Sequence, residues 1–133
     1  FRVARSAARA MRRAGNGGSI IHMSSQMGHV GSPGRTVYCM TKHGIEGLNR
    51  AMAVELAGSG VRVNCVAPTF IETPMTGPML EDPAFAEFVN ERIPLGRVGN
   101  VADVALAVLY LASGASALVT GDSLRVDGGW TAQ

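Results

Sequence analysis

The chain has 133 residues, of which 47% are hydrophobic and 17% charged, a balance typical of one globular domain and not of a disordered segment. The net charge of +2 is too small to indicate a nucleic-acid partner. The longest apolar run, residues 104–112, is far shorter than the roughly 20 residues needed to span a bilayer, and no stretch has the pattern of a secretory signal. We therefore expect no nucleic-acid or membrane partner, and the two cysteines, which lack metal spacing, favour a reduced chain in the cytoplasm.

Residues 2–14 predict a helix with two different faces. One face carries arginines (Arg2, Arg5, Arg9, Arg12 and Arg13) and the other small or flexible apolar residues (Ala4, Ala7, Ala10, Met11 and Ala14). The basic face could bind an anionic partner, but we favour a solvated surface. Because the chain begins inside this helix without an initiator Met, we expect it to be a segment of a longer protein.

A strand, a long helix and a second strand follow. Residues 19–23 predict a buried strand, 24–35 a polar glycine-rich loop, 36–57 a long helix, and 61–66 a β-branched strand that Pro68 ends. A strand–helix–strand crossover is right-handed and gives parallel strands. Ligands bind beyond the carboxyl ends of such strands, so Ser24, Ser25 and residues 68–73 should lie together.

The remaining segment predicts a weak helix at 75–92, a loop at 94–99, a helix capped by Asn100 and running to about residue 112, and a strand at 123–126. Three parallel strands leave open edges and half-covered faces. We therefore expect an α/β fold: part of a Rossmann-like, doubly wound parallel sheet in three α/β/α layers, a single domain whose N-terminal half is missing.

The long helix places Tyr38 and Lys42 at the head of one stripe. Stepping by about 100° per residue, the stripe continues through Ile45, Asn49, Met52 and Leu56, so its lower part faces the sheet. Such a pair can be an ordinary exposed one, but a lysine on a core-facing stripe requires a partner. A phenol is a weak acid at neutral pH, and an ammonium about 5 Å away stabilises its phenolate by roughly 3 kcal/mol at an effective dielectric near 20. The spacing thus predicts proton transfer by Tyr38.

Ser25 precedes Tyr38 by thirteen residues, which gives a Ser…Tyr-x-x-x-Lys arrangement with Lys42. The chain also contains GSIIHMSS (18–25), YCMTK (38–42), GVRVNCVAP (60–68), VTG (119–121) and VDGG (126–129). These segments, in this order, resemble the short-chain dehydrogenase/reductase family. The resemblance covers nearly the whole chain, but only the C-terminal half of the family pattern.

The resemblance implies a role for each member of this trio. Ser25 would hydrogen-bond the substrate oxygen, Tyr38 would be the catalytic acid and base, and Lys42 would hold the ribose hydroxyls of NAD or NADP and assist Tyr38. Ser24 is disfavoured because its spacing to Tyr38 is one residue too long. The implied activity is interconversion of an alcohol and a carbonyl by hydride transfer.

Other implied positions lie on the two loops. Pro68, Ile71 and Thr73 match cofactor-binding positions, together with Tyr38 and Lys42. Beside Ser25, Gln26 and His29 are candidates for substrate contact, although a lone loop histidine is commonly a surface residue. Residues 75–93 resemble the family's variable substrate lid.

The chain also departs from the family pattern. Thr69 stands where the family usually has glycine, and neither the glycine-rich dinucleotide fingerprint nor the relay asparagine is present. No metal is expected, because His22 and His43 have no partner at ligand spacing and neither cysteine has metal spacing.

Substrate and assembly are predicted more coarsely. The segment VDGGW (126–130) slightly favours a sugar, polyol or similar small substrate. A 3-oxoacyl-carrier-protein reductase-like enzyme and a non-catalytic or truncated family member are the alternatives. The far side of the long helix is also apolar, at Met40, Gly47, Ala51 and Val54. A helix apolar on both sides needs a second cover, so we expect a homodimer or homotetramer.

Overall fold

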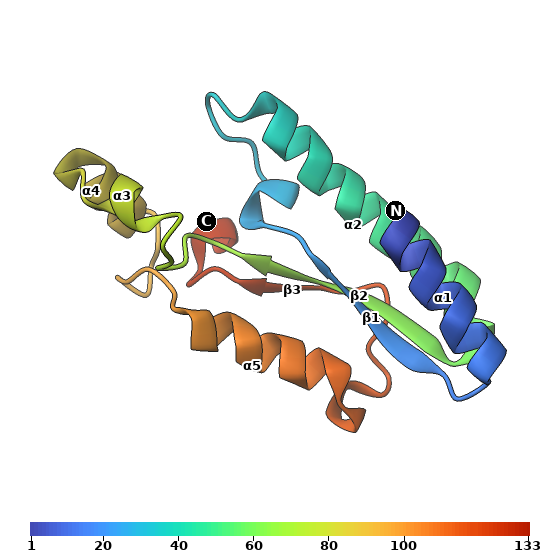
Figure 1. Cartoon of the computed structure of the whole chain (residues 1–133). Coiled ribbons are helices and arrows are strands. Elements are labelled where there is room, and N and C mark those ends of the chain that lie inside the picture. The colour runs from blue at the N-terminus through green and yellow to red at the C-terminus, as the bar shows by residue number, and fades with distance from the viewer.

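The protein is described by a computed structural model that covers all 133 residues. Its helices and strands, in chain order, are α1 (Arg2–Ala14), β1 (Gly18–Met23), α2 (Thr36–Leu56), β2 (Val61–Pro68), α3 (Gly77–Leu80), α4 (Pro83–Glu91), α5 (Val101–Ala112) and β3 (Ser123–Val126). The three strands are parallel and lie in the order β1-β2-β3. Helices α1 and α2 cover one face of the sheet and α5 the other (Figure 1), which confirms the three-layer α/β/α prediction.

The main core lies between the sheet and the pair α1 and α2. Its buried members are Ala4, Ala8, Ile20, Met52, Ala53, Leu56, Val61 and Val63. Alternate residues of β2 face this core, as a strand with period two requires. The small alanines of α1 allow the helix to pack closely against α2 and the sheet.

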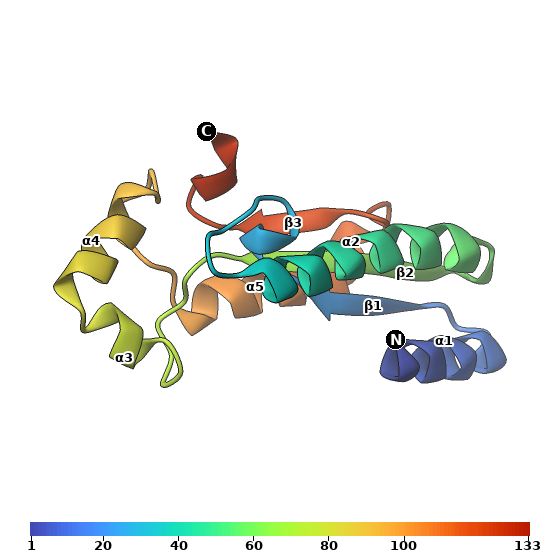
Figure 2. The ribbon, with the colours of Figure 1, turned by 90° about the horizontal axis from the view of Figure 1, so that it is seen from above.

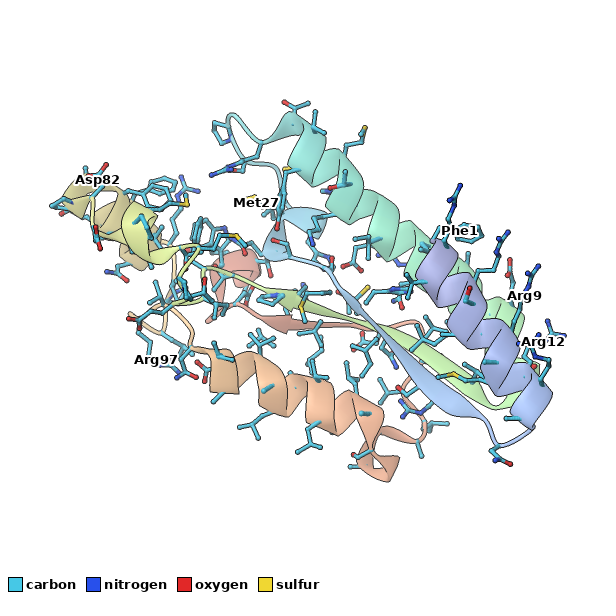
Figure 3. The ribbon with its side chains drawn as sticks, viewed as in Figure 1. Phe1, Arg9, Arg12, Met27, Asp82 and Arg97 are labelled. Carbon is cyan, nitrogen blue, oxygen red and sulfur yellow. The ribbon has the colours of Figure 1, made fainter.

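The buried face of α1 differs from the predicted one. Ala4 and Ala8 are buried and Ala7 and Met11 pack beside them, whereas Ala10 and Ala14 are exposed. The buried stripe is therefore narrower than the predicted face and turned slightly, because Ala4 and Ala8 lie one helical turn apart. The arginines project away from the sheet, as the labelled Arg9 and Arg12 show (Figure 3), and form a solvated face.

The far side of α2 is exposed in this chain. Met40 is 66% exposed and Val54 82% exposed, and Gly47 and Ala51 are exposed beside them. The apolar surface that motivated the homodimer or homotetramer is therefore uncovered here, and the oligomer stays a prediction.

None of the helices combines the length and the apolar character needed to cross a bilayer.

Buried polar side chains of β2 hold the turn that leads into β3. The Asn64 side chain donates to Val119 O at 2.9 Å and accepts from Asp122 N at 3.0 Å, and it is fully buried. On the same face of the strand, Arg62 donates to Leu111 O at 2.8 Å at the end of α5. Because buried backbone groups need partners, these side chains fix where β3 begins.

Two segments depart from their predicted bounds. Strand β2 runs two residues further than expected, to Pro68, because the last residue of the strand need not donate to a neighbour. The weak helix expected at 75–92 is two helices, α3 and α4. Asp82 accepts from Ala84 N and caps α4, and Pro83, which has no N–H, starts it. Both helices stand beyond the carboxyl ends of the strands, apart from the other helices (Figure 2).

The N-terminus of α5 is fixed by a reciprocal cap. The Asn100 side chain accepts from Asp103 N at 3.0 Å, and Asp103 accepts from Asn100 N at 2.8 Å. Arg97 donates to both oxygens of Asp103, at 2.8 and 3.1 Å. The hydrogen bonds from Arg97 and from the Asn100 backbone lower the pKa of Asp103 to about 2.

Replacement of Asn64 is expected to destabilise the protein. In Asn64→Ala the groups of Val119 and Asp122 lose their partners, so the free energy of unfolding should fall by about 1–3 kcal/mol. Chemical denaturation of the full-length protein measures the change. The matched control is Asn90→Ala, at an exposed position of α4, which should stay within about 0.5 kcal/mol of the parent. Equal effects of the two changes would contradict the role of Asn64.

The cap of α5 predicts a pH-dependent contribution to stability. The pKa of Asp103 is lower in the folded protein than in the unfolded chain, so its contribution is complete above about pH 4 and is lost as the pH falls through 2. Asp103→Asn should therefore lower Tm at pH 7, and the difference from the parent should shrink toward pH 2. Thermal melts across this range, with exposed Glu87→Gln as the control, measure it. A difference that is independent of pH would contradict the assignment.

Candidate active site

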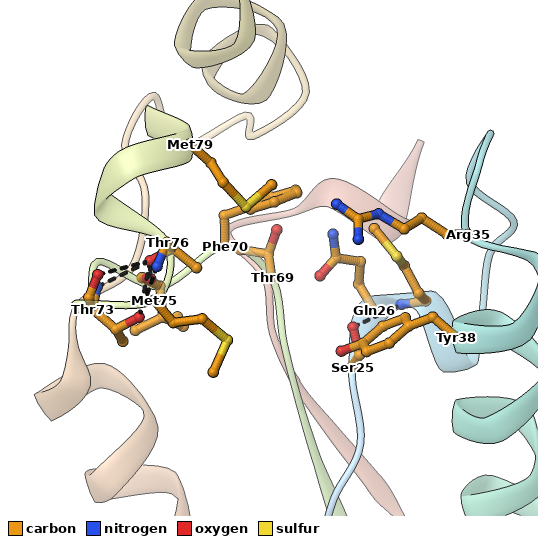
Figure 4. A pocket seen from close by; sticks show the side chains of 12 residues that line it. Ser25, Gln26, Arg35, Tyr38, Thr69, Phe70, Thr73, Met75, Thr76 and Met79 are labelled. Atoms are coloured by element: carbon orange, nitrogen blue, oxygen red, sulfur yellow. Dashed lines mark hydrogen bonds between the residues drawn. The ribbon is translucent and has the colours of Figure 1, made fainter. Parts of the chain in front are cut away.

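A cavity of about 250 Å³ lies where the first two strands end (Figure 4). One wall comes from the residues after β1 and from the start of α2, and includes Ser25, Gln26 and Tyr38. The opposite wall comes from the segment after β2, and includes Thr69 and Ile71. The predicted juxtaposition of the two loops is therefore observed.

Ser25 faces this cavity and Ser24 does not line it. Ser25 is 7% exposed and begins the short 3-10 turn Gln26–Gly28, where its Oγ accepts from Met27 N at 3.2 Å. Since that oxygen is the acceptor, the hydroxyl hydrogen of Ser25 is free. Ser24 is buried and its Oγ has no partner. Of the two serines, Ser25 alone shares the cavity with Tyr38.

Tyr38 and Lys42 lie one helical turn apart at the start of α2. Tyr38 lines the cavity and is 43% exposed. Lys42 does not line the cavity; its Nζ donates to Met23 O, the last residue of β1, at 3.0 Å and lies 5.4 Å from the centre of the Tyr38 ring. The lysine thus has the partner that its place on the helix required, and its ammonium is close enough to act on the phenol.

The segment after β2 is held in place by backbone pairing with the loop before α5. Ile71 forms a parallel bridge with Gly99, which donates to Phe70 O at 3.0 Å and accepts from Glu72 N at 2.8 Å. The Thr73 hydroxyl lies 3.0 Å from the Thr76 hydroxyl. This pairing explains how an irregular segment keeps a defined shape beside the cavity.

Several groups on this segment fit a nicotinamide cofactor. Thr69 Oγ1 is buried without a hydrogen-bond partner, in a residue that lines the cavity. Ile71 and Thr73 line the cavity as well, whereas Pro68 ends β2 half-buried and does not. An orphaned hydroxyl beside backbone and threonine groups suits the amide of a nicotinamide, which donates and accepts hydrogen bonds. Thr69 had been noted only as a departure from the family pattern.

His29 does not line the cavity and lies in a partly buried cluster with Glu46 and Ser123. Ser123 Oγ donates to Glu46 Oε1 at 3.0 Å, and His29 Nε2 lies 3.0 Å from Ser123 Oγ and 3.3 Å from Glu46 Oε1. Since the serine hydroxyl donates to the carboxylate, the histidine Nε2 donates to the serine. Glu46 is 2% exposed, and its second oxygen has no partner. Neither Glu46 nor Ser123 was singled out from the sequence, although Glu46 follows Lys42 by one helical turn.

Glu46 and Cys65 are buried close to each other. Burial raises the pKa of the Cys65 thiol to about 12, and the Glu46 carboxylate adds to that rise. Burial likewise lowers the pKa of His22. Gly28 allows the turn to approach α2, because a Cβ there would lie 2.8 Å from Ser24 Oγ and 3.2 Å from Lys42 O. The turn after β1 is therefore pressed directly onto the helix that carries Tyr38.

The segment that includes α3 and α4 is anchored by aromatic side chains. The Phe70 ring lies 5.5 Å from the Phe85 ring and 5.7 Å from the Trp130 ring, and Trp130 lies 6.4 Å from Phe88. Met75 and Met79 line the cavity from this segment.

The structure contains no group of three or more His, Cys, Asp or Glu side chains that could hold a metal ion.

Known proteins resemble this chain over most of its length. The model of the family described as enoyl-(acyl carrier protein) reductase matches residues 1–131. A 3-oxoacyl-[acyl-carrier-protein] reductase, FabG, of Thermotoga maritima is 48% identical over 112 residues, which are 84% of this chain and 45% of that protein. A (3R)-3-hydroxyacyl-CoA dehydrogenase of Mus musculus is 45% identical over 129 residues, 97% of this chain and 49% of that protein. The chain thus spans about half the length of the curated relatives it matches.

A solved structure gives the same result for the fold. A gluconate 5-dehydrogenase from Burkholderia cenocepacia in complex with NADP and tartrate superposes with a TM-score of 0.94 at 35% identity, covering 98% of this chain and 51% of that one. The family resemblance stated on the sequence motifs is confirmed, and the matched part is about one half of the longer proteins. This chain belongs to the short-chain dehydrogenase/reductase family.

Proposed function

We propose that the full-length protein is an NAD(P)-dependent oxidoreductase that interconverts an alcohol and a carbonyl by hydride transfer. The observation that carries the proposal is the placement of Ser25 and Tyr38 on one cavity, with the Lys42 ammonium 5.4 Å from the phenol ring. Family membership supports a nicotinamide as the hydride carrier. The non-catalytic alternative is disfavoured because all three polar groups are present with suitable contacts.

The proton chemistry follows from the contacts of these residues. Ser25 Oγ accepts from Met27 N, so its hydrogen can be donated to the carbonyl oxygen of a substrate. The phenol of Tyr38 then supplies a proton to the same oxygen as the hydride reaches the carbon, and takes it back in the oxidative direction. The ammonium of Lys42 stabilises the phenolate that remains. One of its hydrogens is held by Met23 O, and the others can bond ribose hydroxyls.

We propose that NAD or NADP lies against the segment after β2. Thr69 Oγ1, the backbone of Ile71 and the Thr73 hydroxyl would hold the carboxamide and phosphate end of the nicotinamide half, with Pro68 ending the strand beneath. The cofactor supplies or accepts the hydride when it is bound. NADP in the gluconate 5-dehydrogenase supports this class of cofactor.

Two substrate classes remain in competition, and we prefer a small polar one. Gln26 and Arg35 give the wall beside Tyr38 a polar surface, which suits a hydroxylated or acidic carbonyl compound, and the similar gluconate 5-dehydrogenase supports this choice. The second candidate is a 3-oxoacyl thioester. The 48% identity to a 3-oxoacyl-[acyl-carrier-protein] reductase and the apolar Met75 and Met79 favour it. In either case residues 75–93 would act as the lid, closing on Phe70.

We further propose that Glu46 positions the catalytic groups. Its carboxylate is joined through Ser123 to β3 and lies within 3.3 Å of His29, just after the turn that carries Ser25. Glu46 is also one helical turn after Lys42. It therefore connects the helix that carries Tyr38 with the turn that carries Ser25, without touching the substrate.

Replacement of Tyr38 is the direct test of the proposed function. Tyr38→Phe removes the hydroxyl that transfers the proton, so kcat should fall by about 100-fold or more. Oxidation of NADH and NADPH by the full-length protein against a carbonyl panel measures it. The control is Tyr110→Phe, on α5, which should keep the parent rate. Turnover by Tyr38→Phe at the parent rate would refute the role of Tyr38.

Replacement of Glu46 tests its positioning role. Glu46→Ala should lower kcat by about 10-fold, which corresponds to the roughly 1–3 kcal/mol associated with leaving buried polar groups unpaired. Glu46→Gln, which keeps an acceptor oxygen for Ser123, should recover most of the rate. The exposed Glu55→Ala on the same helix is the control. A merely structural role would lower Tm and leave kcat unchanged in the folded enzyme, and that result would contradict positioning.

A further inference from the structure

Arg35 brings an unpaired cation to the catalytic cavity. Its side chain lines the same cavity as Ser25 and Tyr38, and Figure 4 shows it reaching over Gln26. No carboxylate lies within 4 Å of its guanidinium, and the guanidinium makes no hydrogen bond within the chain. Arg62 and Arg97 differ from Arg35, since Arg62 donates to backbone carbonyls and Arg97 to Asp103. The five N–H donors of Arg35 are therefore available to a ligand.

The place of Arg35 on α2 is unfavourable for the helix itself. It is the N-cap residue and gives no side-chain hydrogen bond to the first turn. Serine, threonine, aspartate or asparagine at an N-cap stabilises a helix by about 1 kcal/mol relative to a side chain that cannot cap. A positive charge at this end also opposes the helix dipole. A common capping residue at this position would therefore stabilise the helix better than the arginine does.

Gln26 provides an independent sign of a polar ligand at the same wall. The residue is only 2% exposed, yet its amide makes no hydrogen bond within the chain. Its side chain lines the cavity and the amide points into it (Figure 4). The amide opens onto the cavity and is unbonded within the chain, so its donor and acceptor groups can pair with groups that a ligand brings. Gln26 and Arg35 together offer an amide and a guanidinium side by side.

We propose that Arg35, assisted by Gln26, binds a carboxylate of the substrate, so that the protein acts on oxo acids and the corresponding hydroxy acids. The inference rests on the proposed function and adds the substrate class to it. A guanidinium binds a carboxylate with two parallel hydrogen bonds, which fixes the orientation of the molecule. Arg35 lies directly before the helix that carries Tyr38, three residues away in the chain, and both side chains line the same cavity. The carboxylate would therefore lie only a few bonds from the reacting carbonyl.

The wall opposite Arg35 suits the carbon skeleton of such an oxo acid. Phe70, Met75 and Met79 face Arg35 across the cavity, and all three are apolar. An oxo acid can place its carboxylate at Arg35, its carbonyl oxygen at Ser25 and Tyr38, and its carbon skeleton against the methionines. Arg35 is exposed, and a neutral ketone forms no ion pair with its guanidinium, so the acid should be preferred.

The test compares oxo acids with their neutral ethyl esters. A panel of short 2-, 3- and 4-oxo acids and the matching esters is offered, with NADH and NADPH, to the full-length parent and to Arg35→Gln and Arg35→Lys. For at least one acid, kcat/KM of the parent should exceed that of the ester by about 10-fold or more, and Arg35→Gln should bring this ratio down to about one. Arg35→Lys, which keeps the charge but not the two-pronged geometry, should lie between. Arg50→Gln, exposed on the same helix, should keep the parent ratio.

Three outcomes overturn the inference: equal rates for acids and esters, a ratio unchanged in Arg35→Gln, or a preference for 3-oxoacyl thioesters over every oxo acid. A failure of the proposed function has a different signature, because no carbonyl compound would then be reduced by the parent. Calorimetric titration of the oxo acids into parent and Arg35→Gln decides the inference in that case. Binding that is lost in the variant supports a carboxylate site at Arg35, and equal or absent binding refutes it.

Discussion

The hydrogen bond from Lys42 to the carbonyl of Met23 is the contact on which the rest of the site depends. It joins the first turns of α2 to the end of β1 at a distance of 3.0 Å. Tyr38 lies one helical turn before this contact, and Ser25 lies two residues after it along the chain. A single bond thus fixes the two polar groups of the cavity relative to each other. It also gives the ammonium a partner in a half-buried place, where an unpaired charge would be unfavourable.

The parallel sheet makes this contact possible. Because β1 and β2 end at the same edge, the residues after each strand lie on two sides of one cavity. The wall of the cavity that follows β1 has a fixed shape, because Gly28 lets its turn pack closely against α2. The second half has no regular structure and takes its shape from the pairing of Ile71 with Gly99. That pairing in turn depends on the capped start of α5.

Much of this could be predicted from the sequence, because the signals are local. Strand length, helical period and the spacing of Tyr38 and Lys42 give the elements and the stripe, and the parallel topology brings Ser25 beside them. The cluster of His29, Glu46 and Ser123 could not be found in this way. Its members are separated by 77 and 94 residues, and they meet only through the register of β3 against β2. The division of residues 75–92 into α3 and α4 did have a local signal, Asp82 followed by Pro83, which ends one helix and begins the next.

The burial of Cys65 beside Glu46 distinguishes the chemistry of the two cysteines. Cys65 is fully buried and burial raises the pKa of its thiol to about 12, so it stays protonated and inert toward alkylating reagents at neutral pH. Cys39 adjoins Tyr38 on α2 and is only half-buried. The chain therefore carries, next to Tyr38 on α2, a natural attachment point for a fluorescent or spin label, and changes around this helix can be followed there without engineering a new thiol.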